Sequence, residues 1–82
     1  MPKTTLRKTL RTKGHRSLID ILVESRKQAG LTQRDLAARL KRPHVFIGCI
    51  EAGERRVDVI EFIEIARVMG VDPEHLFAKL LD

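Results

Sequence analysis

The segment of residues 31–56, LTQRDLAARLKRPHVFIGCIEAGERR, constrains the fold of this chain more than any other. Thr32 is a good N-cap for a first short helix, and Asp35 three residues later fits a weaker version of the capping box. Pro43 suits the first position of a second helix, where a missing N–H costs nothing. Gly53 suits the residue after the end of that helix. The segment therefore predicts two short helices joined by a tight turn.

The apolar residues of these two helices have spacings that allow them to pack on each other. Leu36 and Leu40 share one face of the first helix, and Ile47 and Ile50 share one face of the second. Ala37 is small at a point where the second helix must cross closely. A turn of roughly 3–4 residues between two such helices is the helix-turn-helix plan.

With these residues, the segment resembles the DNA-binding domain of the phage repressor and Cro family, also called Xre-type regulators. An ordered set of residues carries the resemblance, which covers about residues 18–81. The set is Leu31-Thr32-Gln33, Leu36-Ala37, Leu40, Ile47, Ile50-Glu51, Gly53, Arg55, Ile65-Ala66 and Met69-Gly70-Val71, with the helix after Asp72. The resemblance implies an all-α, five-helix repressor-like domain with the helix-turn-helix at helices 2 and 3.

Apolar spacing and capping residues predict the remaining helices. Helix one is expected over about residues 17–29, with Ser17 as its N-cap. Helix four is expected to begin at a capping box of Asp58 and Glu61, and helix five to run over about residues 73–81. The residues expected to face the core are Ile19, Leu22, Val23 and Ala29 in helix one, Val59, Phe62, Ile63, Ala66 and Met69 in helix four, and Leu76 and Phe77 in helix five.

The length and composition of the chain are those of one small globular domain. It has 82 residues, of which 43% are hydrophobic and 33% charged, so it can bury a single small core. No apolar run approaches the roughly 20 residues that a membrane span needs. Cys49 is the only cysteine and cannot form an internal disulfide, which fits a reducing compartment. We therefore expect a cytoplasmic location.

The net charge of +5 is unevenly distributed along the chain. Residues 1–17 contain six Lys and Arg and no acidic residue, so they carry +6, whereas the rest of the chain carries −1. Residues 1–16 also lack an apolar period and are predicted to form a flexible basic arm, with residues 17–82 forming the helix-turn-helix domain. Such an arm is either a solvated tail or a segment that follows nucleic-acid phosphates.

Arg26 lies on the apolar face predicted for helix one. A charge at such a position must find an opposite charge or reach solvent at the edge of the core. The family resemblance implies that it forms a structural ion pair with Glu51, near the end of the second motif helix. The alternative is that the Arg26 side chain extends to solvent.

The sequence offers no pattern of residues for catalysis or for metal binding. His15, His44, His75 and Cys49 do not have the spacing of a zinc site. A Gly-rich phosphate loop and a nucleophile elbow are also missing from the sequence. We therefore expect no enzymatic activity, no bound metal and no cofactor.

A helix beginning at Pro43 would place its reading residues near its start. By resemblance, the base-reading positions are His44, Val45, Gly48 and Cys49. Gln33, at the amino end of the preceding helix, is expected to hold a phosphate together with free helix N–H groups. Further phosphate contacts are expected from the basic residues that flank this surface, which are Arg34, Lys41, Arg42, Arg55 and Arg56.

The sequence departs from the family at two places that bear on function. Lys41 stands where the turn usually has glycine, and a left-handed conformation there would cost about 1 kcal/mol. Val45, Gly48 and Cys49 stand where polar residues are usual. Either the protein reads a thymine-rich or shape-defined site, or this surface binds a protein partner.

These observations predict a sequence-specific double-stranded DNA-binding transcriptional regulator that acts as a homodimer on a two-fold operator. The alternative is a protein-interaction module on the same fold, antitoxin-like or a regulator partner, with only non-specific DNA affinity. The dimer seam is expected among apolar residues that do not face the core, unless these simply complete it. The candidates are Ile60, Ile65, Val68, Leu80 and Leu81.

Overall fold

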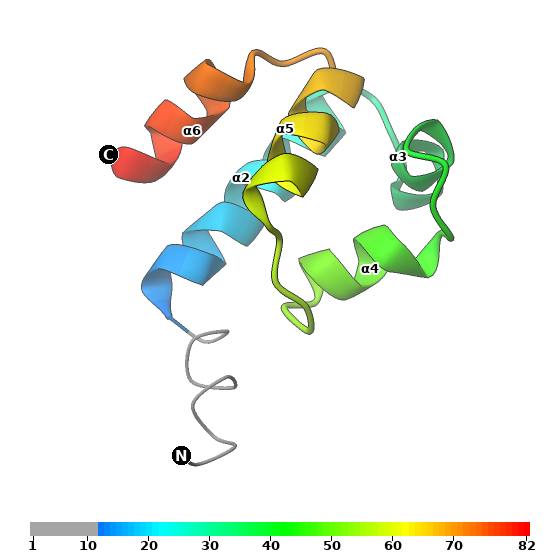
Figure 1. The fold of residues 1–82 in the computed structure, drawn as a ribbon, viewed down its shortest axis with the longest axis horizontal. Coiled ribbons are helices and arrows are strands. Elements are labelled where there is room, and N and C mark those ends of the chain that lie inside the picture. The colour runs from blue at the N-terminus through cyan, green and yellow to red at the C-terminus, as the bar shows by residue number, and fades with distance from the viewer. Residues whose placement is uncertain (1–11) are drawn as a thin grey trace.

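The computed structural model describes residues 12–82, which form five helices and contain no strand. In chain order these helices are α2 (Lys13–Gln28), α3 (Gln33–Arg39), α4 (Val45–Glu51), α5 (Val59–Val68) and α6 (Pro73–Leu81) (Figure 1). The all-α fold class predicted from the sequence is confirmed. None of the helices in this part of the chain has the length and apolar character needed to cross a membrane.

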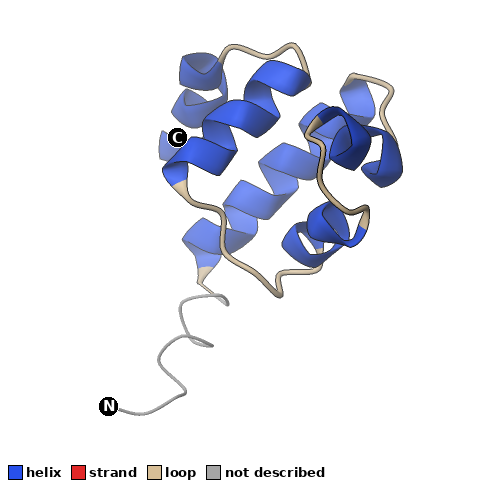
Figure 2. Ribbon diagram, turned by 45° about the vertical axis from the view of Figure 1, so that its right-hand side comes forward, coloured by secondary structure: helices blue, strands red, loops and turns tan. Residues whose placement is uncertain are grey.

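The helices surround one core. α2 and α5 are the two central helices of the arrangement, as Figure 1 shows. α2 packs against α4 and α6, α5 packs against α6 and α3, and α3 packs against α4. Short loops join consecutive helices, as the turned view in Figure 2 shows. Each of these helices contributes buried apolar residues, and two more lie just outside helix ends: Leu22, Leu31, Leu36, Ala37, Ile47, Ile50, Phe62, Ile65, Ala66, Met69 and Leu76.

Local capping starts three of the helices where the sequence predicts. The Thr32 hydroxyl accepts from the Asp35 backbone N–H over 2.9 Å, and the Asp35 carboxylate accepts from the Thr32 N–H over 3.0 Å. Asp58 and Glu61 form the same reciprocal pair at the start of α5. Asp72 caps α6, with proline at the first helical position. Each cap satisfies a backbone donor that the first turn leaves unpaired.

The first described helix begins earlier than predicted. α2 starts at Lys13, and its N-cap is Thr12, whose hydroxyl accepts from the His15 backbone N–H over 3.2 Å, so Ser17 is not the cap. Leu18 packs against the core, and this contact stabilises the amino-terminal part of the helix. Residues 13–16 are therefore helical. The rest of the predicted arm, residues 1–11, lies outside the described residues.

The turn between α3 and α4 has the left-handed residue that the family resemblance implies at Lys41, with φ of 57°. The Lys41 N–H donates to the Ala38 carbonyl and the Arg42 N–H to the Ala37 carbonyl, each over 3.0 Å. These two bonds make a Schellman motif, which offsets the strain of a non-glycine residue there. α4 then begins at Val45 rather than Pro43, because the Pro43 carbonyl first accepts the Phe46 N–H in a tighter turn.

The core face of α5 agrees with the prediction at Phe62, Ala66 and Met69 but differs at other positions. Val59, expected in the core, is 72% exposed, whereas Ile65, expected at a dimer seam, is only 2% exposed. The buried stripe includes Phe62, Ile65 and Ala66, which also fits helical spacing. In α6, Leu76 is buried as predicted, but Phe77 is 49% exposed, and its ring makes an edge-to-face contact with Phe62.

Candidate nucleic-acid interface

α4 buries one side and turns the predicted reading residues outward. Ile47 and Ile50 are 2% and 1% exposed, whereas Val45 is 57% exposed. His44, directly before the helix, is also exposed, and Cys49 is partly exposed. The 3.6-residue period requires this arrangement, because burial of positions 47 and 50 turns positions 45 and 49 away from the core.

Arg26 and Glu51 form an ion pair that joins α2 to the end of α4. Nε of Arg26 donates to Oε2 of Glu51 over 2.7 Å, and Nη2 donates to Oε1 over 2.9 Å. Each side chain is only 10% exposed. The hydrogen bonds to Glu51 raise the pKa of Arg26 above its ordinary value, although burial opposes this. The pairing expected from the resemblance is thus present, and Arg26 does not extend to solvent.

The same ion pair also orients Gln33 at the start of α3. The Gln33 amide Nε2 donates to Oε1 of Glu51 over 2.8 Å, and Nη1 of Arg26 donates to the Leu31 carbonyl over 2.8 Å. One carboxylate therefore fixes groups from α2, α3 and α4 relative to one another. One Gln33 side-chain N–H already donates to Glu51. The amide can therefore offer a ligand its second N–H as a donor and its oxygen as an acceptor.

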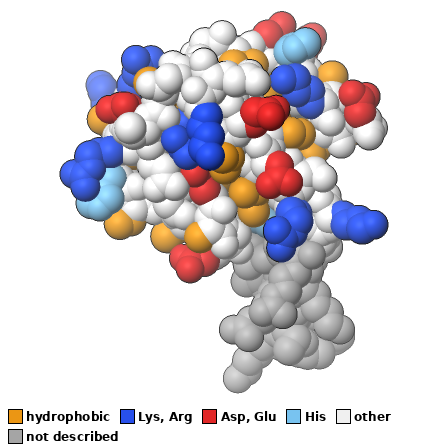
Figure 3. Space-filling model, turned by 180° about the vertical axis from the view of Figure 1, so that it is seen from behind, with side chains coloured by type: hydrophobic (Ala, Val, Ile, Leu, Met, Phe, Trp, Pro, Cys, Tyr) orange, Lys and Arg blue, Asp and Glu red, His pale blue; other side chains and the backbone are white. Residues whose placement is uncertain are grey.

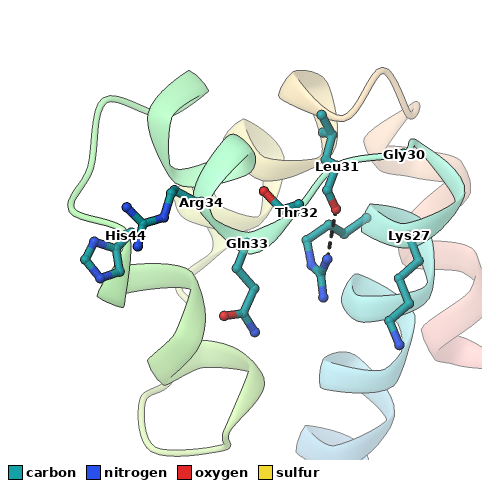
Figure 4. Close-up of a pocket in the computed structure, with 8 residues that line it drawn as sticks. Lys27, Gly30, Leu31, Thr32, Gln33, Arg34 and His44 are labelled. Carbon is teal, nitrogen blue, oxygen red and sulfur yellow. Dashed lines mark hydrogen bonds between the residues drawn. The ribbon is translucent and has the colours of Figure 1, made fainter.

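A surface pocket lies between the end of α2 and the start of α3, next to His44 just before α4, and cationic side chains line it. In Figure 4, Arg34 extends from α3 toward His44, while Gln33 points down between α3 and α4 and Lys27 projects from the end of α2. Arg26 completes the lining, and its Nη1 donates to the Leu31 carbonyl. The pocket thus combines positive charge with an exposed helix start, which is the chemistry that binds a phosphate.

A second basic cluster lies on another flank of α4, around Phe46. The Cζ atoms of Arg42 and Arg55 lie over the Phe46 ring, 4.6 and 4.7 Å from its centroid. Arg55 makes two hydrogen bonds to the buried Glu61 carboxylate, of 3.0 and 2.9 Å. These bonds from Arg55 hold the pKa of Glu61 below its ordinary value, and burial opposes them.

The structure does not gather all of the predicted phosphate contacts on one surface. Lys41 is exposed in the turn before α4, whereas Arg56 lines a separate pocket with His15, Leu18 and Leu80. Burial lowers the pKa of His15 below its ordinary value, and the positive charge of Arg56 lowers it further. Arg56 therefore belongs to the end of the domain where α2 begins.

Basic side chains are spread over the surface of the domain. In Figure 3, a basic side chain and a histidine lie side by side at the left edge, and acidic, basic and apolar side chains are interspersed over this face. Among residues 12–82, no three His, Cys, Asp or Glu side chains cluster closely enough to hold a metal ion.

Comparison with known proteins agrees with this geometry. A family model described as helix-turn-helix matches residues 22–76, which is more than half of the chain. The solved structure of an XRE-family like protein from Pseudomonas syringae pv. tomato str. DC3000 is 46% identical in sequence. It covers 93% of each chain with a TM-score of 0.83. The chain belongs to the XRE-type helix-turn-helix family. No curated protein matches the chain.

Membership of the XRE-type family makes this protein a DNA-binding regulator, and the position of α4 makes that helix its candidate recognition helix. Two residues of the surface were not expected there from the sequence. Glu61 was expected only as a cap and no basic contact was expected for Phe46, yet both contact the arginines beside α4, and Phe46 also packs against the core. The four-residue spacing of Arg42 and Phe46 was the only local signal for this cluster.

Gly48 is not required by packing within the domain. A Cβ built at this position would lie 3.6 Å from Oε1 of Gln33, which is an ordinary van der Waals contact. Glycine inside a helix is about 1 kcal/mol less favourable than alanine. Gly48 therefore lowers the stability of α4 at the centre of its outward face, and packing within the XRE-type domain does not explain why glycine stands there.

Proposed function

We propose that this protein is a sequence-specific double-stranded DNA-binding transcriptional regulator that acts in the cytoplasm as a homodimer on a two-fold operator. The observation that carries the proposal is the outward face of α4, where the exposed Val45 is flanked by two basic clusters. Such a helix fits the major groove, and cations beside it can hold the phosphates on either side.

The proposed base contacts come from His44, Val45 and Cys49. His44 can donate to guanine or accept from an amino group, and Val45 can pack on a thymine methyl group. The absence of a side chain at Gly48 allows base edges or backbone to approach α4 closely. Among the basic residues, we assign phosphate contacts to Arg34, Lys41 and Arg42, with Gln33 at the start of α3.

A selection of bound sites from random duplexes tests the reading surface. The parent protein is expected to enrich one two-fold sequence, and Val45→Ala is expected to relax its preference at one base pair by about 1 kcal/mol or somewhat more. Val23→Ala, on α2, is the matched control and should leave the selected site unchanged. If alanine at positions 44, 45 and 49 does not alter the selected site, α4 does not read bases.

The proposed homodimer uses exposed apolar side chains of α5 and α6, two helices that pack on each other. Val59, Ile60 and Leu81 are 72%, 64% and 72% exposed. A recognition helix reads only a few base pairs, so two half-sites about one helical turn apart require two copies. Of the predicted seam residues, Ile60 and Leu81 remain candidates, as does the partly buried Leu80, and Val59 and Phe77 join them. Ile65 is excluded by its burial, while Val68 packs partly against the core.

Sedimentation at micromolar concentration, with and without the selected duplex, tests the dimer. Leu81→Glu is expected to shift the protein toward monomer and to weaken binding to the two-fold site, because a charge would have to be desolvated at the seam. Ala38→Glu, at an exposed position on α3, adds the same charge away from the seam and should leave the free protein's sedimentation unchanged. A parent protein that is monomeric both free and on DNA would contradict the proposal.

A protein-interaction module on the same fold is the second candidate function. The exposure of Val45 favours it, because an exposed valine that lies near Gly48 and Cys49 on α4 suits an apolar partner. The two candidates differ in one measurement. A regulator stays bound to its two-fold site in excess competitor DNA, whereas the interaction module binds all duplexes equally and loses them together as salt rises.

A further inference from the structure

We propose that Phe46 and Glu61 are positioning residues that hold the Arg42 guanidinium ready for a DNA phosphate oxygen. The inference rests on the proposed DNA-binding function and adds two residues that do not themselves need to touch DNA. It follows from the arrangement of Arg42, Arg55, Phe46 and Glu61 beside the outward face of α4.

The Phe46 ring supports both guanidinium groups. Their Cζ atoms lie 4.6 Å and 4.7 Å from the ring centroid, within the range of a cation–π contact. Two cations so close to one ring repel each other, and a nearby anion can offset this repulsion. Glu61 supplies this anion, because its Oε2 lies 2.9 Å from Nη2 of Arg55 and 4.0 Å from Nη1 of Arg42.

Arg55 and Arg42 differ in how many of their donors are already used. Arg55 donates twice to Glu61 and once to the Arg56 carbonyl, so its guanidinium is largely committed inside the domain. Within residues 12–82, the Arg42 side chain makes no hydrogen bond, and it is 42% exposed. Arg42 therefore presents a nearly complete fork of donors, the geometry that matches two phosphate oxygens.

Glu61 does not present a free negative charge to DNA. Its side chain is 11% exposed, and both of its oxygens accept from Arg55, while Oε1 also accepts from the Asp58 N–H over 3.1 Å. The charge of Arg55 thus neutralises that of Glu61, and the cluster keeps a net charge of about +1, which lies on Arg42. A long, flexible arginine that is stacked and electrostatically tethered before binding loses less conformational freedom when it meets its ligand.

The cluster also lies at a suitable place relative to α4. Phe46 precedes Cys49 by one helical turn, so it borders the outward face on the Cys49 side. Gly48 borders Gln33 on the other side of the same face, where a built Cβ lies 3.6 Å from the Gln33 amide oxygen. The two basic clusters therefore flank the reading face on separate sides, as phosphates flank the major groove.

A double-mutant cycle on Arg42 and Phe46 tests the inference, with binding measured by fluorescence anisotropy. Arg42→Ala is expected to weaken binding on the order of tenfold, as for the loss of a charge-assisted bond, and to lower the salt slope by about 0.9. Phe46→Leu is expected to weaken binding several-fold in the parent but to have no further effect in Arg42→Ala. A Phe46→Leu effect that is equally large in both backgrounds would overturn the inference.

Glu61→Gln gives a second test, because the positioning role and a simple effect of overall charge predict opposite changes in DNA affinity. Removal of a negative charge should strengthen DNA binding if only the overall charge matters. If Glu61 positions Arg42, the variant should instead bind more weakly, and this weakening should disappear when Arg42 is alanine. Tighter binding by Glu61→Gln would overturn the positioning role. Because glutamine retains an oxygen that can accept from the Asp58 N–H, the cap of α5 is preserved.

The cycle is run on the selected duplex and on an unrelated duplex, because phosphate contacts do not depend on sequence. Equal parental affinity for the two duplexes would contradict the proposed operator function, yet the cycle would still report on Arg42. Additive effects on both duplexes, or an Arg42→Ala variant that binds as tightly as the parent, would overturn this inference alone. Arg34→Ala combined with Phe46→Leu is the control pair and should be additive, since the two side chains share no partner.

Discussion

Replacement of Arg26 by methionine is expected to lower the free energy of unfolding by about 3–5 kcal/mol. The variant leaves the Glu51 carboxylate, whose side chain is 10% exposed, without its partner. It also removes a donor from the Leu31 carbonyl, so two acceptors must be satisfied in another way. Urea denaturation gives the change in unfolding free energy. An unchanged slope of this free energy against urea concentration would show that the variant exposes the same surface on unfolding as the parent.

Two further variants separate the ion pair from a general effect of charge. Arg16→Met, at an exposed position of the same helix, should change stability by no more than about 0.5 kcal/mol. The double variant Arg26→Met/Glu51→Leu should recover part of the loss, because apolar residues often replace a buried pair at little cost. If Arg26→Met and Glu51→Gln both unfold at the parent's midpoint, the pair has no structural role.

Removal of residues 1–11 is expected to flatten the salt dependence of DNA binding strongly while leaving the fold intact. The segment contains Lys3, Arg7, Lys8 and Arg11 and no acidic residue. For every phosphate that the shortened protein no longer neutralises, the slope of log affinity against log salt concentration should fall by about 0.9. The truncation ends before Thr12, because the Thr12 side chain caps α2 through the His15 N–H. Titrations at several salt concentrations measure the slope.

A full-length variant with the four basic residues replaced by glutamine is the matched control for length. It should reproduce the lower slope, because the effect depends on charge. The preferred site from the selection should stay the same, since an arm that follows phosphates adds affinity without reading bases. A truncated protein with the parent's salt slope would show that the arm is a solvated tail.

Local chemistry explains why much of this fold could be predicted from the sequence. Thr32 with Asp35, and Asp58 with Glu61, are capping boxes whose partners lie within one helical turn. The left-handed conformation of Lys41, which the family resemblance implies, is closed by backbone hydrogen bonds within the same turn. Each of these features depends on a few consecutive residues, so tertiary contacts were not needed to locate them.

Features that depend on distant residues were predicted less well. α5 is apolar around much of its circumference, so the spacing of its residues fits more than one core face. Packing against α3 and α6 buries Ile65 and leaves Val59 exposed. The start of α2 at Lys13 was also not predicted, because Leu18 packs on residues that are distant in the sequence. Periodicity alone could not choose between faces that are similarly apolar.

The sequence by itself determined the helical content, the caps and the helix-turn-helix connection, because these follow from contacts within a few residues. It also identified Arg26 as a charge in need of a partner, although Glu51 was named only through the family resemblance. Only the tertiary structure decided that Arg42 and Arg55 share the Phe46 ring beside a buried Glu61. That cluster joins a turn, two helices and a loop, and the distances between such elements are set by packing of the whole core.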